Sequence, residues 1–274
     1  MIFDLEKRTA ALSVGEFACF SLGPRDALGS GAAGLWRAQL GTHWHNELRT
    51  RAVTEFASAA QFELPVSGQV FEHGWTLTLT GRIDQLIRGE RRITLREIKS
   101  VTRPLPADEA ELRTDYPEYF IQLATYGALS RIGALRPDEL GTTIEGSACL
   151  ELVFVEVGSG LAQTVPLTPA DETRFGVQLQ RVVEFLDLRL RARERLRGLR
   201  FRPAFATPRP GQETTQRELT ALFERYPLVL FEAPTGFGKT GVLLEFALGQ
   251  LRSGHFDRAL YLTCLLYTSP SPRD

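Results

Sequence analysis

The sequence predicts an α/β protein, in which a mixed sheet flanked by helices is followed by the beginning of a second α/β domain. Residues 75–87 and 92–101 alternate apolar and polar side chains, the period of half-buried strands, and residues 147–157 form a third, strongly apolar run. Residues 119–132 and 174–200 carry apolar residues at helical spacing. A proline-rich stretch then leads into an apolar run, a glycine-rich loop and a further helix, which indicates another domain.

The composition is that of an ordinary globular protein. The chain has 274 residues, 43% hydrophobic and 24% charged, and its net charge of -1 means that any nucleic-acid surface must be a local patch. Cys19, Cys149 and Cys264 are far apart, so we expect no iron–sulfur cluster and a reducing compartment. No apolar run reaches transmembrane length and no signal-peptide core is present. We therefore expect a cytoplasmic protein without a membrane partner.

A helix is predicted from Gly41 onward, and two histidines lie near its start. Trp44 and Leu48 lie on one apolar stripe of this helix, beside His43 and His45. A histidine beside an apolar stripe is more often a packed core residue than a metal ligand. The spacing alone leaves both interpretations open.

The strands at 75–87 and 92–101 are predicted to form a hairpin that brings charged residues together. If its turn centres on Glu90 and Arg91, position 84 faces position 97, with Cβ atoms about 5 Å apart. Glu97 and Lys99 are two residues apart, so they share one face of the sheet with Asp84.

This face carries apolar side chains and ends in two carboxylates and an ammonium group. Buried charges are costly unless they are paired or bind a metal, and two carboxylates at this separation repel each other. Oxygen ligands of this kind favour Mg²⁺ or Mn²⁺, and a lysine beside the metal can stabilise developing charge or orient the attacking water. The alternative is a structural salt bridge at the rim of the sheet.

Lysine usage favours a special role for Lys99. Of the 32 lysines and arginines, only those at positions 7, 99 and 239 are lysines. Wherever positive charge alone suffices, this sequence uses arginine. A lysine at position 99 therefore indicates that a compact point charge is needed there.

The helix predicted at 119–132 presents a polar, aromatic face. Gln122 and Tyr126 are four residues apart and share this face with Tyr119, while Phe120 and Leu123 lie on the packing side. Such a face near a metal site can stack a base or hold a phosphate. A half-buried helix rich in tyrosine is the alternative.

The long helix at 174–200 ends in a basic run, with six arginines between Arg191 and Arg202. Contact with phosphates and a solvated helix face are both compatible with this charge. We expect residues 1–202 to form the first domain and residues 203–212 to form a linker.

The second domain, at residues 213–263, is predicted to begin with a nucleotide-binding loop. The run PLVLFEA, the loop PTGFGKT and the following helix form the strand–loop–helix order of a P-loop. Backbone N–H groups of the loop hold the phosphates in this arrangement, the lysine reaches the terminal ones and the threonine binds magnesium. We assign these roles to Thr235, Gly236, Gly238, Lys239 and Thr240.

The second domain is expected to be incomplete. The run ALYLT predicts its next parallel strand, but no second acidic motif or later arginine follows, and hydrolysis of ATP needs both. Residues 264–274 resemble the artefactual tail of a broken translated read.

Together these motifs resemble the RecB-type branch of the PD-(D/E)XK nuclease superfamily, over roughly residues 10–200. The resemblance implies a restriction-endonuclease-like fold and metal-dependent cleavage of DNA. Its G-x-x-x-H helix places His45 as a metal ligand, its aspartate falls on Asp84, and its (D/E)-x-K motif falls on Glu97 and Lys99. The backbone carbonyl of Ile98 is implied as a further ligand.

The resemblance also covers the helix that follows the hairpin. The Q-x-x-x-Y motif of this branch, which is thought to touch DNA near the scissile phosphate, falls on Gln122 and Tyr126. Many relatives carry a four-cysteine iron–sulfur cluster. Cys19 lies near the place of the first cysteine, but the other three are missing.

The rest of the chain resembles the start of superfamily 2 helicases of the DinG/XPD type, with a RecA-like motor domain. Their R-P-G-Q motif falls on Arg209–Gln212, which implies that Gln212 recognises adenine, and their E-A-P-T-G-x-G-K-T motif falls on Glu232–Thr240. The two resemblances imply a Mg²⁺- or Mn²⁺-dependent nuclease, acting on single-stranded DNA, fused to an ATP-dependent helicase. The alternatives are an inactive nuclease-fold domain that binds DNA or one that binds a partner, in either case tethering the motor.

Overall fold

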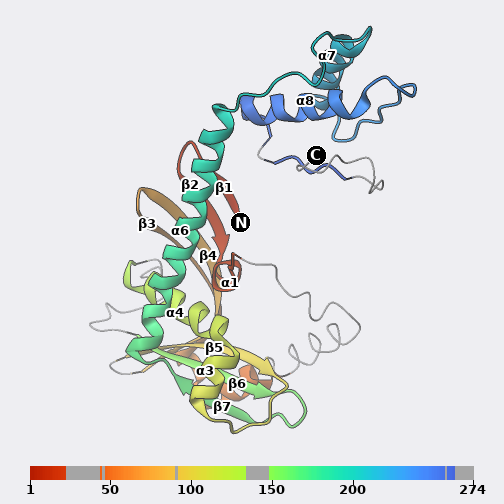
Figure 1. Cartoon of the computed structure of the whole chain (residues 1–274). Helices are drawn as coiled ribbons and strands as arrows, with labels where there is room; N and C mark the ends of the chain where they lie inside the picture. The colour runs from red at the N-terminus through yellow and green to blue at the C-terminus, as the bar shows by residue number, and fades with distance from the viewer. Residues whose placement is uncertain (23–43, 45–46, 90–91, 134–147, 257, 263–274) are drawn as a thin grey trace. The chain divides into compact units, whose positions relative to one another are not determined.

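The computed structural model describes residues 1–22, 44, 47–89, 92–133, 148–256 and 258–262. Its first compact unit is residues 1–187 and its second is residues 188–274. The first unit contains a seven-stranded mixed sheet with helices against it (Figure 1). The elements in chain order are β1 (Ile2–Asp4), β2 (Thr9–Ser13), α1 (Val14–Ala18), η1 (Ala57–Ala59), β3 (Ala60–Glu72), β4 (Trp75–Arg88), β5 (Ile93–Val101), α3 (Glu109–Asp115), α4 (Pro117–Arg131), β6 (Cys149–Glu156), β7 (Ala162–Pro166), α6 (Pro169–Arg197), α7 (Gln212–Phe223) and α8 (Lys239–Ser253).

The sheet is built around β4. Its strand order is β1-β2-β4-β5-β6-β7, and β3 pairs with β4 outside this order. β4 pairs antiparallel with β3 and β5, as do β1 with β2 and β6 with β7, while β2 with β4 and β5 with β6 are parallel. The three strands expected from periodicity correspond to β4, β5 and β6, and the expectation of a mixed sheet flanked by helices is confirmed.

Apolar side chains fill both faces of the sheet at β5 and β6. Phe154 of β6 packs against Phe120 of α4 on one face. Successive strand residues point to opposite faces, so Ile98 and Val153 lie on the other, where Trp44 and Leu48 pack against them. Residues 47–56 are helical, as expected, and α4 and α6 correspond to the two predicted helices.

One helix was not expected, because its segment has the composition of a loop. Asp108 accepts hydrogen bonds from the backbone N–H groups of Ala110 and Glu111 and so caps the start of α3. The cap is visible in the sequence as an aspartate before Glu109–Asp115. The neighbouring prolines, which are typical of loops, obscured it.

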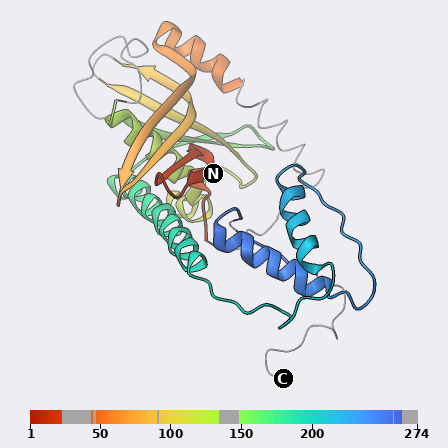
Figure 2. The same ribbon diagram turned by 90° about the horizontal axis from the view of Figure 1, so that it is seen from above.

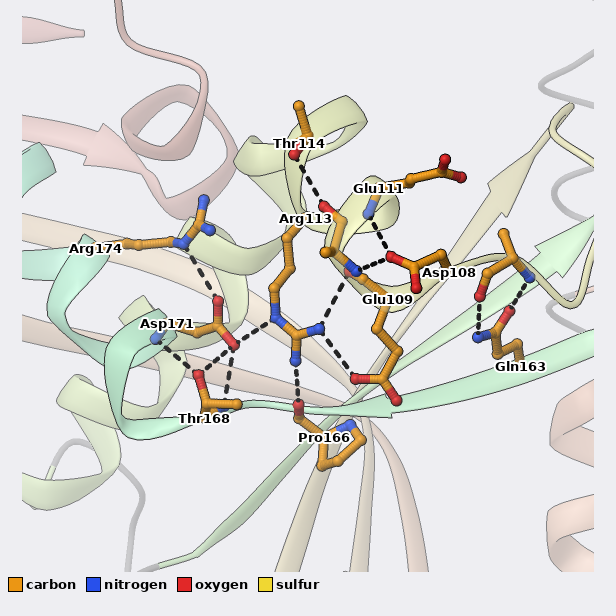
Figure 3. A network of polar contacts seen from close by, with 12 residues as sticks. Asp108, Glu109, Glu111, Arg113, Thr114, Gln163, Pro166, Thr168, Asp171 and Arg174 are labelled. Carbon is orange, nitrogen blue, oxygen red and sulfur yellow. Dashed lines mark hydrogen bonds and ion pairs between the residues drawn. The ribbon is translucent and has the colours of Figure 1, made fainter.

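A polar network joins α3, β7 and the start of α6 (Figure 3). Asp171, 2% exposed, accepts hydrogen bonds from the backbone N–H and the hydroxyl of Thr168 and from Nε of Arg113, and it pairs with Arg174. Arg113 also donates to Glu109 and to the backbone carbonyl of Pro166. Burial alone raises the pKa of Asp171, but these hydrogen bonds outweigh it and hold the pKa below its ordinary value.

The second unit contains α7 and α8, and the strands expected within it are absent from its described residues. The run at 227–233 is not a strand, and Leu228 and Leu230 are almost fully exposed. Residues 258–262 of the second expected strand are also irregular. A parallel strand needs hydrogen-bonding neighbours and cover on both faces, and the described residues supply neither to these runs. The expectation of strands at PLVLFEA and ALYLT is therefore wrong for the residues that the structure describes.

The units divide within α6, between Asp187 and Leu188, earlier than the boundary expected at residue 202. α6 runs as one helix from Pro169 to Arg197 (Figure 2). No helix in the described ranges combines the length and apolar character that a membrane span requires.

We predict that Asp171→Ala lowers the free energy of unfolding by about 3 kcal/mol, because it leaves the Arg113 guanidinium without its buried partner. The folded pKa of Asp171 is depressed, so this stabilisation is present above the unfolded value of 3.8 and is lost as the pH falls through the folded pKa. Urea denaturation between pH 7 and pH 3 measures both effects. Glu172→Ala breaks a more exposed pair with Arg131 and should cost less than about 1 kcal/mol. Equal losses from the two variants would contradict the prediction.

Candidate active site

The site lies where β4 lacks a strand neighbour along one edge. β3 pairs with the other edge, whereas β2 pairs with residues 76–80 and β5 with residues 85–88 of this edge. Residues 81–84 lie between the two partners. The register with β3 also skips Asp84, opposite Glu63, whose φ of 55° is in the left-handed region. Backbone outside the ladder is a common feature of functional sites.

The hairpin brings the two predicted carboxylates together. Its observed pairs run from Arg88 and Ile93 to Gln85 and Arg96, and one further step of this register places position 84 opposite position 97. The register predicted from the turn is thus confirmed, although the turn residues themselves lie outside the described part of the chain. The carboxylate of Asp84 accepts a hydrogen bond from the backbone N–H of Ile98 at 2.7 Å. This bond connects β4 to β5 beyond the last ladder pair.

Glu97 is the most deeply buried acid of the site, at 2% exposure. Its Oε1 accepts hydrogen bonds from Nζ of Lys99 at 2.9 Å and from the amide of Gln122. Its Oε2 is buried and has no hydrogen-bond partner among the described residues. Burial raises the pKa of Glu97 to about 7, against the lowering effect of Lys99, and the charge of Asp84 raises it further.

Lys99 is held between a carboxylate and an aromatic ring. Besides its bond to Glu97, its ammonium lies 5.4 Å from the ring centre of Tyr119, within cation–π range. Tyr119 in turn stacks in parallel on Tyr116. Burial lowers the pKa of Lys99, but the charge of Glu97 and its hydrogen bond outweigh this effect, and the pKa is raised. Lys99 is therefore cationic at neutral pH.

The helix α4 closes the gap in the sheet with Tyr126. Its hydroxyl donates to the backbone carbonyl of Arg82 at 2.9 Å and lies 3.4 Å from the Gln122 amide. Burial raises the pKa of Tyr126 to about 12, so the hydroxyl keeps the proton that it donates. Tyr126 shares the Gln122 face of α4, as expected, but at 2% exposure it packs against the sheet and is not an exposed part of that face. Gln122 is half-buried and faces Glu97.

Gly81 is a site residue that the motif search missed. A Cβ atom at this position would lie 2.8 Å from the Tyr126 ring and 3.0 Å from its hydroxyl. Only glycine lets the ring reach the backbone of β4 at this point. A glycine inside a strand signals such a close approach, and this signal was available in the sequence.

The site residues suit a hard divalent cation. The orphaned Oε2 of Glu97 is a buried carboxylate oxygen without a donor, beside a second carboxylate, and a cation would satisfy it. Three metal-ligating side chains do not cluster within the described ranges. His45, the third side chain expected to bind the metal, lies outside them.

The predicted nucleotide loop of the second unit is partly formed. α8 starts at Lys239, directly after Gly238, whose φ of 86° requires glycine, and Gly236 is also left-handed. Lys239 donates to the backbone carbonyls of Ala233 and Pro234. Gln212 is buried and donates to the carbonyl of Phe237 at 2.6 Å.

Thr240 lies in the first turn of α8, with its hydroxyl 3.4 Å from that of Tyr261. A small pocket beside the loop is lined by Gln212. The other lining residues are Pro203, Phe205, Pro208, Glu213, Gln216 and Glu245.

We predict that the free energy of unfolding, measured in EDTA, falls as the pH rises from about 4.5 to about 7. The folded pKa of Glu97 is about 7 and its unfolded value 4.5, so the native state holds one more proton in this window and loses about 3 kcal/mol across it. Urea denaturation at several pH values measures the slope. Glu97→Gln stays neutral and should flatten it, whereas the exposed Glu55→Gln should leave it unchanged. An unchanged slope in Glu97→Gln would assign the effect to another group.

Comparison with solved structures finds distant neighbours of this chain. Among solved structures, the protein SSO0001 is 19% identical, with a TM-score of 0.34, over 52% of this chain and 60% of its own length. A putative exonuclease from Eubacterium rectale is 13% identical, with a TM-score of 0.37, over 60% of this chain and 56% of its own length. The chain thus spans less than two thirds of either protein.

No curated protein matches the chain by sequence. The pattern of the PD-(D/E)XK nuclease superfamily matches residues 9–214, which are well over half of the chain. This stretch includes the hairpin with both carboxylates, the lysine that pairs with Glu97, and α4. The chain therefore belongs to the PD-(D/E)XK nuclease superfamily.

Proposed function

We propose that the first unit is a metal-dependent deoxyribonuclease that hydrolyses phosphodiester bonds. The observation that carries this proposal is the buried Oε2 of Glu97, which has no partner among the described residues and lies next to Asp84 and to a lysine over the Tyr119 ring. A structural salt bridge would satisfy Glu97 through Lys99 alone and would leave no reason to bury the second oxygen. Membership of the PD-(D/E)XK nuclease superfamily also supports this proposal.

The side chains take distinct roles in this proposal. Asp84, Glu97 and His45 would hold Mg²⁺ or Mn²⁺, with the backbone carbonyl of Ile98 as a further ligand. The bound ion would activate water and stabilise charge on the phosphate. Lys99 stays cationic beside the site, where it stabilises negative charge on the phosphate or orients the water.

Gln122 and Tyr126 support the carboxylates in this proposal. Gln122 orients Glu97, and its exposed part is the element of α4 best placed to contact a DNA phosphate. Tyr126 is committed to the backbone of Arg82, so its contribution is to fix β4 in place. We infer a RecB-type enzyme that acts on single-stranded DNA, on the strength of the Q-x-x-x-Y helix and the (D/E)-x-K strand taken together.

We predict that residues 1–274 cut end-labelled single-stranded DNA with Mg²⁺ or Mn²⁺ and not with EDTA. Lys99→Ala should slow cutting about a hundredfold or more, because it removes the positive charge next to the developing negative charge. Lys7→Ala is the matched control, since Lys7 is an exposed lysine far along the chain from the site, and it should cut at the parent rate. Gel analysis of the labelled products measures the rate and begins to give the polarity.

One outcome of this experiment would refute the proposed activity. If neither metal supports cutting while the parent and Lys99→Ala bind the strand equally, the domain is a tether that binds DNA. If the parent does not bind the strand either, the result favours the alternative of a domain that binds a partner protein. Parallel reactions with duplex DNA and RNA test the proposed substrate.

We also propose that the second unit binds ATP as the start of a helicase motor. The support is the left-handed Gly236 and Gly238 before α8, with Gln212 hydrogen-bonded to the same loop. In the intact protein Lys239 and Thr240 would serve the phosphates and magnesium, beside the backbone N–H of Thr235.

We predict that MgATP raises the melting temperature of this chain slightly and that Lys239→Ala abolishes the rise, because Lys239 supplies the charge that meets the phosphates. Differential scanning fluorimetry with a MgATP titration measures the shift. Arg252→Ala, at the opposite end of α8, is the control and should retain it. A shift of equal size in Lys239→Ala would place ATP elsewhere.

A further inference from the structure

We propose that the arginine segment, residues 189–202, is a binding surface for the phosphate backbone of a nucleic acid, separate from the cutting site. The segment comprises the last turns of α6 and the first residues after it. It contains seven arginines against one glutamate, in a chain whose net charge is -1. Its seven arginines are Arg189, Arg191, Arg193, Arg195, Arg197, Arg200 and Arg202.

The segment gathers several arginines that are exposed and lack a carboxylate partner. Some arginines of the first unit are paired with carboxylates, for example Arg96 with Glu151 and Arg131 with Glu172. Within the described residues, Arg191, Arg195 and the two arginines at 200 and 202 are exposed and have no carboxylate within ion-pair distance. Their charge is therefore not neutralised by the protein around them.

This part of α6 is also not held by burial. The buried residues of the helix end at Leu186, and the helix continues to Arg197. Arg191 and Arg195 are spaced i and i+4, on one side of the helix. Like charges at this spacing destabilise a helix by a few tenths of a kcal/mol per pair. A helix that keeps this repulsion beyond its last fully buried residue is suited to a partner that supplies many negative charges.

The spacing of the arginines fits an extended polyanion. Arg191 and Arg195 lie about 6 Å apart along the helix axis, and the arginines at 200 and 202 follow in the irregular chain after the helix. Guanidinium groups donate in a fork that matches phosphate oxygens. The choice of a nucleic acid over other polyanions rests on the proposed nuclease function of the same chain. Such a surface holds a strand without reading its sequence, since phosphate contacts position and base contacts specify.

The test is the salt dependence of binding. The full chain with Lys99→Ala, in EDTA so that no strand is cut, is titrated onto a fluorescein-labelled oligothymidylate at several salt concentrations. Each phosphate contact contributes about 0.7 to the slope of log K against log salt for a single strand. Replacing Arg191, Arg195, Arg200 and Arg202 together by glutamine should reduce this slope by about 3 and weaken binding at least tenfold at low salt. The helix should be as stable as before, because the substitution removes repulsion.

Two further variants make the result specific. Arg181, Arg217, Arg225 and Arg258 are exposed, and glutamine at all four removes the same net charge from scattered positions, so the slope should stay as in the parent. Arg200→Gln with Arg202→Gln lies beyond α6, cannot unfold it, and should reduce the slope by about 1.4. Equal losses from the scattered and clustered variants, or an unchanged slope in the clustered ones, would overturn the proposal.

The outcome is independent of cleavage. A slope that falls as expected while the parent does not cut DNA in Mg²⁺ or Mn²⁺ would support the surface and refute the nuclease proposal. Metal-dependent cutting with an unchanged slope would support the nuclease proposal and refute the binding surface.

Discussion

The site depends on one constraint, the interruption of hydrogen bonding along β4 between its two neighbours. Among the described strands, none pairs with residues 81–84 on the edge shared by β2 and β5. Buried backbone groups must be satisfied, so side chains supply the missing bonds. Tyr126 binds the carbonyl of Arg82, and Asp84 accepts from the N–H of Ile98. The side chains that supply these hydrogen bonds to the sheet are thus also residues of the candidate site.

Side chains of α4 form a row of hydrogen bonds that connects β4 to β5. Tyr126 holds β4, Gln122 lies next to its hydroxyl, and Gln122 reaches Glu97 on β5. A change at any member therefore affects both carboxylates, although only Glu97 is touched by the amide. Gly81 is needed for these hydrogen bonds, since it lets the ring of Tyr126 approach the strand.

The carboxylate geometry could be predicted from the sequence, but its surroundings could not. The register of Asp84 and Glu97 followed from strict alternation and a short turn, both local properties. The burial of Tyr126 and the place of Gly81 depend on where α4 packs, which no periodicity encodes. α3 was missed because its cap lies among prolines. The expected strand at PLVLFEA did not form, since apolar character alone does not provide a neighbouring strand.

Stability and function make opposite demands on Glu97. Burial that raises its pKa to about 7 also makes its ionised form costly, and one of its oxygens has no donor. On the other edge of β4, Glu63 holds a left-handed backbone opposite Asp84, which costs about 1 kcal/mol or more in a non-glycine residue. Both costs fall at one point of the sheet, while the core around it is well packed. A cation between the two carboxylates would offset the first cost, so occupancy of the site and stability of the fold are expected to be coupled.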